Sequence, residues 1–206
     1  MAAATVERNS LIICGPSGVG KGTVIKSLLS LWGDDRLSLS VSHTTRQPRV
    51  GEIDGVHYNF VSKPYMEEAL KQPDVFLEYA QVHGNLYGTS RAAVETVHQK
   101  GKTCILDVDV DGVRQIKAQH FPGKYVFLTP PSIDVLVERL KGRSTETEAQ
   151  IALRMQTAEE VITYGTTANN FDLVVVNNDL NETLRILNNH LVDWFPHVFQ
   201  LQRSPR

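Results

Sequence analysis

The sequence predicts an α/β fold in which helices flank a mostly parallel sheet. Short apolar runs typical of buried strands alternate with helical patterns along much of the 206 residues. A glycine-rich loop follows the first apolar run, and a pair of aspartates follows a later one. Because such sheets bind ligands at the carboxyl ends of their strands, we expect the functional groups to gather at one edge of the sheet.

The elements of this core follow from the amino terminus onward. The apolar run 11–14 predicts a strand, and apolar residues at helical spacing predict a helix from about Lys21 to Gly33. Further strands are expected at 37–41, 103–107, 125–128 and 172–176. Further helices are expected at 110–119, at 132–141 and from Leu180 to Leu191, with Ser132 as the cap and Gly142 as the end of the second of these. Another helix is expected from the capping box Thr145-x-x-Glu148 to just before Gly165. The residues after Pro196 are expected to form a frayed tail.

The segment from Ser42 to Arg91 differs in character from the rest. Prolines and glycines divide it into short pieces, and its polar side chains are dense. We expect extended stretches at 56–61, 75–81 and 84–88 and a short helix near 64–70. This pattern indicates a small binding subdomain inserted into the core.

Composition limits the classes of function. The formal net charge is −2, and 41% hydrophobic with 21% charged residues is ordinary for one globular domain. No global field favours nucleic acid or an acidic membrane, so any anion site must be local. The two cysteines, Cys14 and Cys104, lie in apolar runs without metal-ligand spacing, which is typical of buried thiols in a reducing compartment. No signal-peptide layout or membrane-length apolar run is present, so we expect a cytoplasmic protein without nucleic-acid or membrane partners.

The glycine-rich loop matches the phosphate-binding pattern G-x-x-x-x-G-K. Its glycines leave room for backbone N–H groups to surround phosphate oxygens, and the following helix points its positive end at the anion. Gly22 occupies the usual Ser/Thr position and Thr23 follows it, so Thr23 or water must replace the missing hydroxyl. An ordinary strand-to-helix turn is the alternative. The expected phosphate-binding residues are Gly15, Pro16, Ser17, Gly18, Val19, Gly20, Lys21, Gly22 and Thr23.

Arg46 and Arg49 flank a turn stiffened by proline. Their planar guanidinium groups suit bidentate phosphate recognition, although solvated surface arginines are the alternative. Glu78 lies in an apolar strand, where a carboxylate either turns outward or meets a donor. Guanine offers two adjacent donors, N1–H and N2–H₂, for one carboxylate. Three further side chains could complete that edge: Ser42, Thr89 and Asp109.

Two more clusters are suited to phosphate chemistry. The acids of Asp107-Val108-Asp109 follow a buried strand, where phosphate-loop enzymes commonly hold Mg²⁺. Arginines around a glycine-hinged turn can stabilise the charge of a phosphoryl-transfer transition state. These are Arg139, Arg143 and Arg154, for which surface salt bridges with Glu146, Glu148 and Glu159 are the alternative.

Together these stretches closely resemble the guanylate kinase family, whose members make GDP and ADP from GMP and ATP. The resemblance covers about residues 11–191 and keeps its motifs in order: GPSGVGKGT, SHTTRQPRVGEIDGVHYNF, FLEYAQVHGNLYGT, CILDVDVDG, RLKGRSTETE and VVVNND. It implies a P-loop kinase core with an inserted mixed α/β GMP-binding subdomain and a short lid. The implied segments are a core of 1–41, 92–141 and 156–206, a GMP-binding subdomain of 42–91 and a lid of 142–155.

The resemblance also implies roles for individual residues. Arg46, Arg49, Tyr58 and Tyr87 would hold the GMP phosphate, and Ser42, Glu78, Thr89 and Asp109 would read the base. The glycine loop and Lys21 would hold the ATP phosphates, with Asn177 near the adenine. The cations at the transferred group would be Lys21, Arg46, Arg139, Arg143 and Arg154. Mg²⁺ would be held through Thr23 and Asp107, in part through water.

The expected reaction is direct transfer of the γ-phosphoryl group of Mg·ATP to GMP, and also to dGMP. A monomer is expected, with a dimer as the alternative. A catalytically inactive guanylate kinase-like module that binds peptides is the rival from another class, but the intact glycine loop with Lys21 argues against it. A phosphate-loop kinase for another acceptor is the second rival, and Glu78 with Asp109 argues against that one.

Overall fold

Five parallel strands form the core sheet in the order β2-β7-β1-β8-β9. The computed structural model describes residues 9–82, 84–141 and 148–199, the last range by its backbone alone up to residue 156. The strands are β1 (Ser10–Cys14), β2 (Leu37–Leu39), β7 (Thr103–Asp107), β8 (Lys124–Thr129) and β9 (Leu173–Val176). The predicted parallel sheet is therefore confirmed, with β1 at its centre.

Helices cover both faces of this sheet because successive residues of a strand point to opposite sides. Leu11 and Ile13 of β1 join one apolar cluster, whereas Ile12 and Cys14 join the other. The first cluster packs against α1 (Lys21–Trp32), α5 (Ile133–Lys141), α7 (Leu180–Trp194) and α8 (Pro196–Phe199). The second packs against α3 (Arg91–His98), α4 (Val110–Ala118) and the C-terminal part of α6 (Glu148–Thr166).

A second, mixed sheet forms a small lobe over residues 42–90. Its strands lie in the order β4-β3-β6-β5, and its core is built around Met66 and Phe76. The amide of Gln115 in α4 fastens the lobe to the core: it accepts from the Tyr79 N–H at 3.1 Å and donates to the Tyr79 carbonyl at 2.9 Å. The elements are β3 (His43–Thr44), β4 (Asn59–Phe60), α2 (Lys63–Leu70), β5 (Phe76–Val82) and β6 (Asn85–Ser90).

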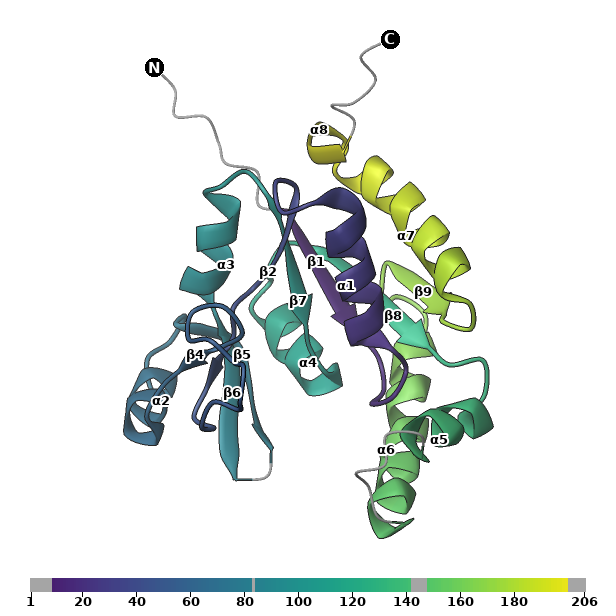
Figure 1. The fold of residues 1–206 in the computed structure, drawn as a ribbon, viewed down its shortest axis with the longest axis horizontal. Helices are drawn as coiled ribbons and strands as arrows, with labels where there is room; N and C mark the ends of the chain where they lie inside the picture. Colours follow the sequence, from purple (N-terminus) through teal and green to yellow (C-terminus); the bar gives the residue numbers. More distant parts are fainter. Residues whose placement is uncertain (1–8, 83, 142–147, 200–206) are drawn as a thin grey trace.

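The small lobe and the α5–α6 pair lie on opposite sides of the loop that follows β1 (Figure 1). The carboxyl ends of the parallel strands point toward the space that these two arms flank (Figure 1). The fold therefore sets the glycine-rich loop between a candidate binding lobe and two helices, of which α5 precedes the expected lid and α6 includes its last residues.

Several expected elements differ in the structure. Helix α3 was not expected, although Ser90 is a recognisable cap whose hydroxyl accepts from the Ala93 N–H at 3.1 Å. The frayed tail after Pro196 is wrong as far as residue 199, because this segment forms α8. There Phe199 is buried and its ring lies 4.7 Å from that of Trp32. The expected helix end at Gly142 and the capping threonine at residue 145 lie outside the described residues.

Gly165 lies inside α6, not past its end as expected. The reason is close packing: a Cβ at Gly165 would come within 2.2 Å of ring atoms of Phe127, which is fully buried in β8. The absent side chain lets α6 approach the sheet directly.

Substituting Gly165→Ala should lower the free energy of unfolding by about 1–3 kcal/mol, because the added methyl overpacks the Phe127 ring. Chemical denaturation would measure the change. Thr163→Ala, at an exposed position two residues earlier in the same helix, is the control and should change stability little. Equal stability of the two variants would contradict this packing role of Gly165.

Candidate functional site

The glycine-rich loop joins β1 to the first turn of α1, as the sequence predicted. Gly18 and Gly20 have φ values of 87° and 102°, a region that strongly favours glycine. A Cβ at Gly15 would lie 2.4 Å from the carbonyl oxygen of Leu128, so the loop passes directly against β8. Lys21 Nζ donates to the Gly15 carbonyl at 2.8 Å across the loop. The loop backbone therefore curves in the way that a phosphate-binding loop requires, and the Lys21 ammonium group already lies across it.

Asn177 and Arg139 brace this loop from outside. The Asn177 side-chain amide donates to the Val19 carbonyl at 2.7 Å. Arg139 Nη1 donates to the same carbonyl at 3.3 Å and to the Asn177 carbonyl at 3.0 Å. These residues border a cavity of about 290 Å³ at the outer side of the loop, lined by Gly18, Val19, Gly20, Thr23, Arg139, Asn177, Asn178 and Leu180. Arg139 therefore lies with Asn177 on this side of the loop, at the end of α5 that precedes the expected lid.

Asp107 and Thr23 come from neighbouring elements, β7 and the first turn of α1. Asp107 reaches solvent, but the surrounding protein desolvates its carboxyl and raises its pKa, an effect that Lys21 partly offsets and Asp109 reinforces. Thr23 is an exposed residue. A carboxylate and a hydroxyl are hard oxygen donors that fit Mg²⁺ held mainly by phosphates and water. Among the described residues, no cluster of three or more potential ligands could hold a metal by itself.

Glu78 is buried in β5 with 9% of its surface exposed, which rules out the outward-facing alternative. Burial raises the pKa of its carboxyl, hydrogen bonds from Thr89 counteract the rise, and the charge of Asp109 adds to it. The Ser42 and Thr89 hydroxyls lie 3.2 Å apart. The structure thus brings together the four predicted base-reading residues at the junction of the small lobe and α4.

Asp109 also has a structural role. It caps α4, and its Oδ1 accepts from the Gly112 N–H at 2.8 Å. A Cβ at Gly112 would lie 3.3 Å from Glu78 Oε2. The first turn of α4 is therefore in contact with the buried carboxylate.

Arg46 lies among aromatic rings and a carboxylate. Its guanidinium carbon is 5.4 Å from the centre of the Tyr58 ring, and the Tyr58 and Tyr87 rings are 6.0 Å apart. Both terminal nitrogens of Arg46 donate to Glu52, each at 2.9 Å. The backbone N–H of Arg49 donates to the same carboxylate at 2.7 Å. Three of the predicted phosphate-binding side chains therefore meet, with the turn of Arg49 beside them.

Glu52 was missed in reading the sequence. Hydrogen bonds from the Arg46 side chain and from the Arg49 N–H lower its carboxyl pKa to about 2, so the group is ionised at any physiological pH. Its place, one residue after the glycine of an Arg-x-Pro-Arg-x-Gly turn, is the signal that could have indicated it. A carboxylate there can bond back to both arginines of the turn.

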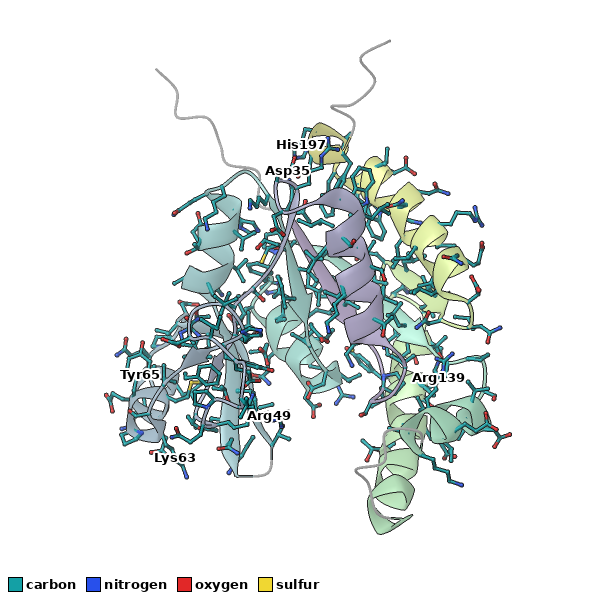
Figure 2. All side chains as sticks on the ribbon, viewed as in Figure 1. Asp35, Arg49, Lys63, Tyr65, Arg139 and His197 are labelled. Carbon is teal, nitrogen blue, oxygen red and sulfur yellow. The ribbon has the colours of Figure 1, made fainter. Side chains whose placement is uncertain are left out.

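The remaining predicted arginines are only partly observable. Arg143 lies outside the described residues, and Arg154 lies in α6, where the backbone alone is described. Figure 2 shows Arg49 on the small lobe and Arg139 in α5, on opposite sides of the glycine-rich loop. Cationic residues therefore lie on both sides of the loop, and Arg139 contacts it directly.

The described residues contain no helix that combines the length and apolar character of a membrane span. Both cysteines, Cys14 and Cys104, are free and buried, and burial raises the pKa of each thiol to about 12. Neither thiol is therefore a candidate nucleophile.

Comparison with known proteins agrees with this geometry. Residues 7–193 match a family model described as guanylate kinase. Guanylate kinase 1 of Arabidopsis thaliana is 47% identical over 91% of this chain, and guanylate kinase 1 of Oryza sativa subsp. japonica is 47% identical over 82% of it. The chain spans only 48% and 44% of the lengths of these two plant relatives.

Other relatives match along nearly their full length. Guanylate kinase of Schizosaccharomyces pombe is 44% identical, with 89% of this chain and 90% of that protein covered. The crystal structure of guanylate kinase from Anaplasma phagocytophilum shares the fold, with a TM-score of 0.62 and 24% identity over 95% of each chain. The family model covers most of the chain, and relatives well above 40% identity agree with it. The chain therefore belongs to the guanylate kinase family.

Proposed function

We propose that the protein transfers the γ-phosphoryl group of Mg·ATP to GMP, and also to dGMP, giving ADP and GDP or dGDP. The observation that carries this proposal is the buried carboxylate of Glu78 beside the Ser42 and Thr89 hydroxyls, across from an intact phosphate-binding loop. Family membership supports the same reaction.

The acceptor base would be read by Glu78. Guanine presents N1–H and N2–H₂ side by side, so one carboxylate accepts both, with Thr89, Ser42 and Asp109 completing the edge. AMP lacks this pair of donors and would leave a buried acceptor without a partner. A site built on such hydrogen bonds can reject the wrong base by about 10⁴-fold.

The acceptor phosphate would bind to Arg46, Arg49, Tyr58 and Tyr87. Arg46 is held by Glu52 against the Tyr58 ring, so its remaining donors are oriented before substrate arrives. Pre-orientation reduces the entropy lost on binding and improves the alignment of the reacting groups.

The donor nucleotide would place its phosphates on the N–H groups of residues 15–23 and on Lys21. Its adenine would occupy the cavity beside Arg139 and Asn177. Mg²⁺ bound at Thr23 and Asp107 would neutralise charge on the transferred group. The protein's own part is to bind both nucleotides in line, to exclude water and to neutralise charge, since the attacking group is already an anionic phosphate oxygen.

Arg143 and Arg154 would complete the site when the lid at 142–155 and the small lobe close over the core. Closure only with both nucleotides bound would limit transfer to water. We also expect a monomer, with a dimer as the alternative, and a cytoplasmic location. The inactive peptide-binding module remains the alternative function. The uninterrupted loop with Lys21 and the assembled Glu78 cluster favour the enzyme.

An ADP-release assay with Mg·ATP and separate nucleoside monophosphates tests the reaction. We expect turnover with GMP and dGMP and little with AMP, CMP or UMP. Lys21→Ala should abolish turnover, because the positive charge that neutralises the outer phosphates of ATP is lost. Lys26→Ala, at an exposed site on the same helix, should leave turnover unchanged. Wild-type protein that binds GMP without turnover would favour the inactive module.

Glu78→Gln should make the folded protein more stable at neutral pH while weakening its recognition of GMP. Burial raises the carboxyl pKa, so the folded protein binds this proton more tightly than the unfolded chain, and ionisation at neutral pH costs stability. The variant should therefore have a higher Tm than wild type at pH 7, and the difference should vanish as pH falls below the ordinary value of 4.5.

The same variant should raise the KM for GMP by about tenfold or more, because a buried charged acceptor is lost. Glu67→Gln, which neutralises an exposed carboxylate on α2, is the matched control. Unchanged GMP kinetics in Glu78→Gln would remove this residue from the base site.

Glu52→Gln tests the carboxylate that holds Arg46. We expect the KM for GMP to rise about tenfold with the KM for ATP unchanged, because charge-assisted hydrogen bonds that orient Arg46 are weakened. Steady-state kinetics with each substrate varied would measure this. Glu68→Gln, which breaks an exposed pair with Lys71 in the same lobe, is the control. A lower KM for GMP would mean that Glu52 competes with the substrate phosphate.

A further inference from the structure

The Val19 carbonyl, in the middle of the glycine-rich loop, accepts from two side chains outside the loop. These donors are the Asn177 amide at 2.7 Å and Arg139 Nη1 at 3.3 Å. Val19 is fully buried and Asn177 is 7% exposed, so water has little access to this carbonyl. The orientation of the peptide unit between Val19 and Gly20 is therefore set by contacts with the β9–α7 connection and α5.

The orientation of this carbonyl determines that of the Gly20 N–H. A trans peptide is planar and its C=O and N–H point in opposite directions, and the described residues contain no cis peptide bond. With the Val19 oxygen directed outward at Asn177, the Gly20 N–H is directed away from Asn177, to the side of the loop on which a phosphate would bind. A rotated peptide would present a carbonyl oxygen to the phosphate and repel it.

The Asn177 amide is in turn oriented by Thr183 in the first turn of α7. The Thr183 hydroxyl donates to Asn177 Oδ1 at 2.9 Å, and Thr183 is fully buried. Because the Val19 carbonyl can only accept, the amide nitrogen must face it, and the amide oxygen must face Thr183. Asp179 stabilises this turn by accepting from the Glu182 N–H at 2.8 Å.

We propose that Thr183 is a positioning residue for the phosphate-binding loop, which acts through Asn177 to hold the Val19–Gly20 peptide so that its N–H faces the phosphates of the donor nucleotide. The proposal rests on the proposed function only for the identity of that nucleotide. Thr183 does not line the 290 Å³ cavity, and its hydroxyl is bonded to Asn177, so we expect its effect on binding to be indirect.

Thr183→Val tests this, because valine keeps the shape and removes the hydroxyl that Asn177 Oδ1 needs. Calorimetry should show a Kd for Mg·ATP that is about threefold to tenfold weaker, the effect of one lost buried hydrogen bond, with the Kd for GMP unchanged. Inorganic tripolyphosphate has no nucleobase and can bind only through its phosphates, and its affinity for the variant should fall by the same factor. Thr183→Ser should restore wild-type affinity.

Thr103→Val is the matched control. Thr103 is also fully buried, in β7, but its hydroxyl has no hydrogen-bond partner among the described residues. This variant makes the same chemical change without touching the loop and should bind both nucleotides as wild type does.

Two outcomes would overturn the proposal. In the first, Thr183→Val binds Mg·ATP with a Kd within twofold of that of wild type. In the second, the variant loses affinity for ATP and for GMP equally, as general destabilisation would produce. If the valine variant does not fold, Thr183→Ala against Thr183→Ser gives the same comparison, and equal ATP affinities would overturn the proposal. Binding is measured without turnover, so absence of GMP phosphorylation in wild type would refute the proposed function and leave the role of Thr183 to be decided by calorimetry.

Discussion

The burial of β1 is the constraint on which the rest of the structure depends. All five of its residues are buried, because it pairs with β7 and β8 and carries helices on both faces. Its end therefore fixes where the glycine-rich loop leaves the sheet and where α1 begins. Since parallel strands end at the same edge, Asp107 at the end of β7 and Asn177 just after β9 arrive on either side of that loop.

Cationic side chains around this edge are already bonded to acceptors of the protein itself. Lys21 donates to the Gly15 carbonyl, Arg46 to the Glu52 carboxylate and Arg139 to the carbonyls of Val19 and Asn177. Binding of a phosphate to such groups exchanges or adds hydrogen bonds, so the net gain for each is modest. The benefit is pre-orientation, because the cations are held near their working positions before a nucleotide arrives.

Local patterns in the sequence predicted most of the core. The uninterrupted apolar run of β1, the glycine spacing before Lys21 and the apolar spacing of α7 depend only on neighbours along the chain, and the expected strand, connecting loop and helix were confirmed. The order of motifs was sufficient to indicate the family. Errors arose where tertiary packing overrides local preference: Gly165 resembles a helix end, but lies within α6 because of Phe127, and the short segment after Pro196 is ordered by burial of Phe199.

The sequence by itself determined most elements of the core, the phosphate-binding loop and the kinds of side chain available for anions and a base. Only the tertiary structure decided which side of its strand Glu78 faces and that Thr183 reaches the loop through Asn177. The physical reason is distance along the chain. The hydrogen bond from Asn177 to the Val19 carbonyl joins residues 158 positions apart, so it depends on the register and packing of whole elements, which no local pattern specifies.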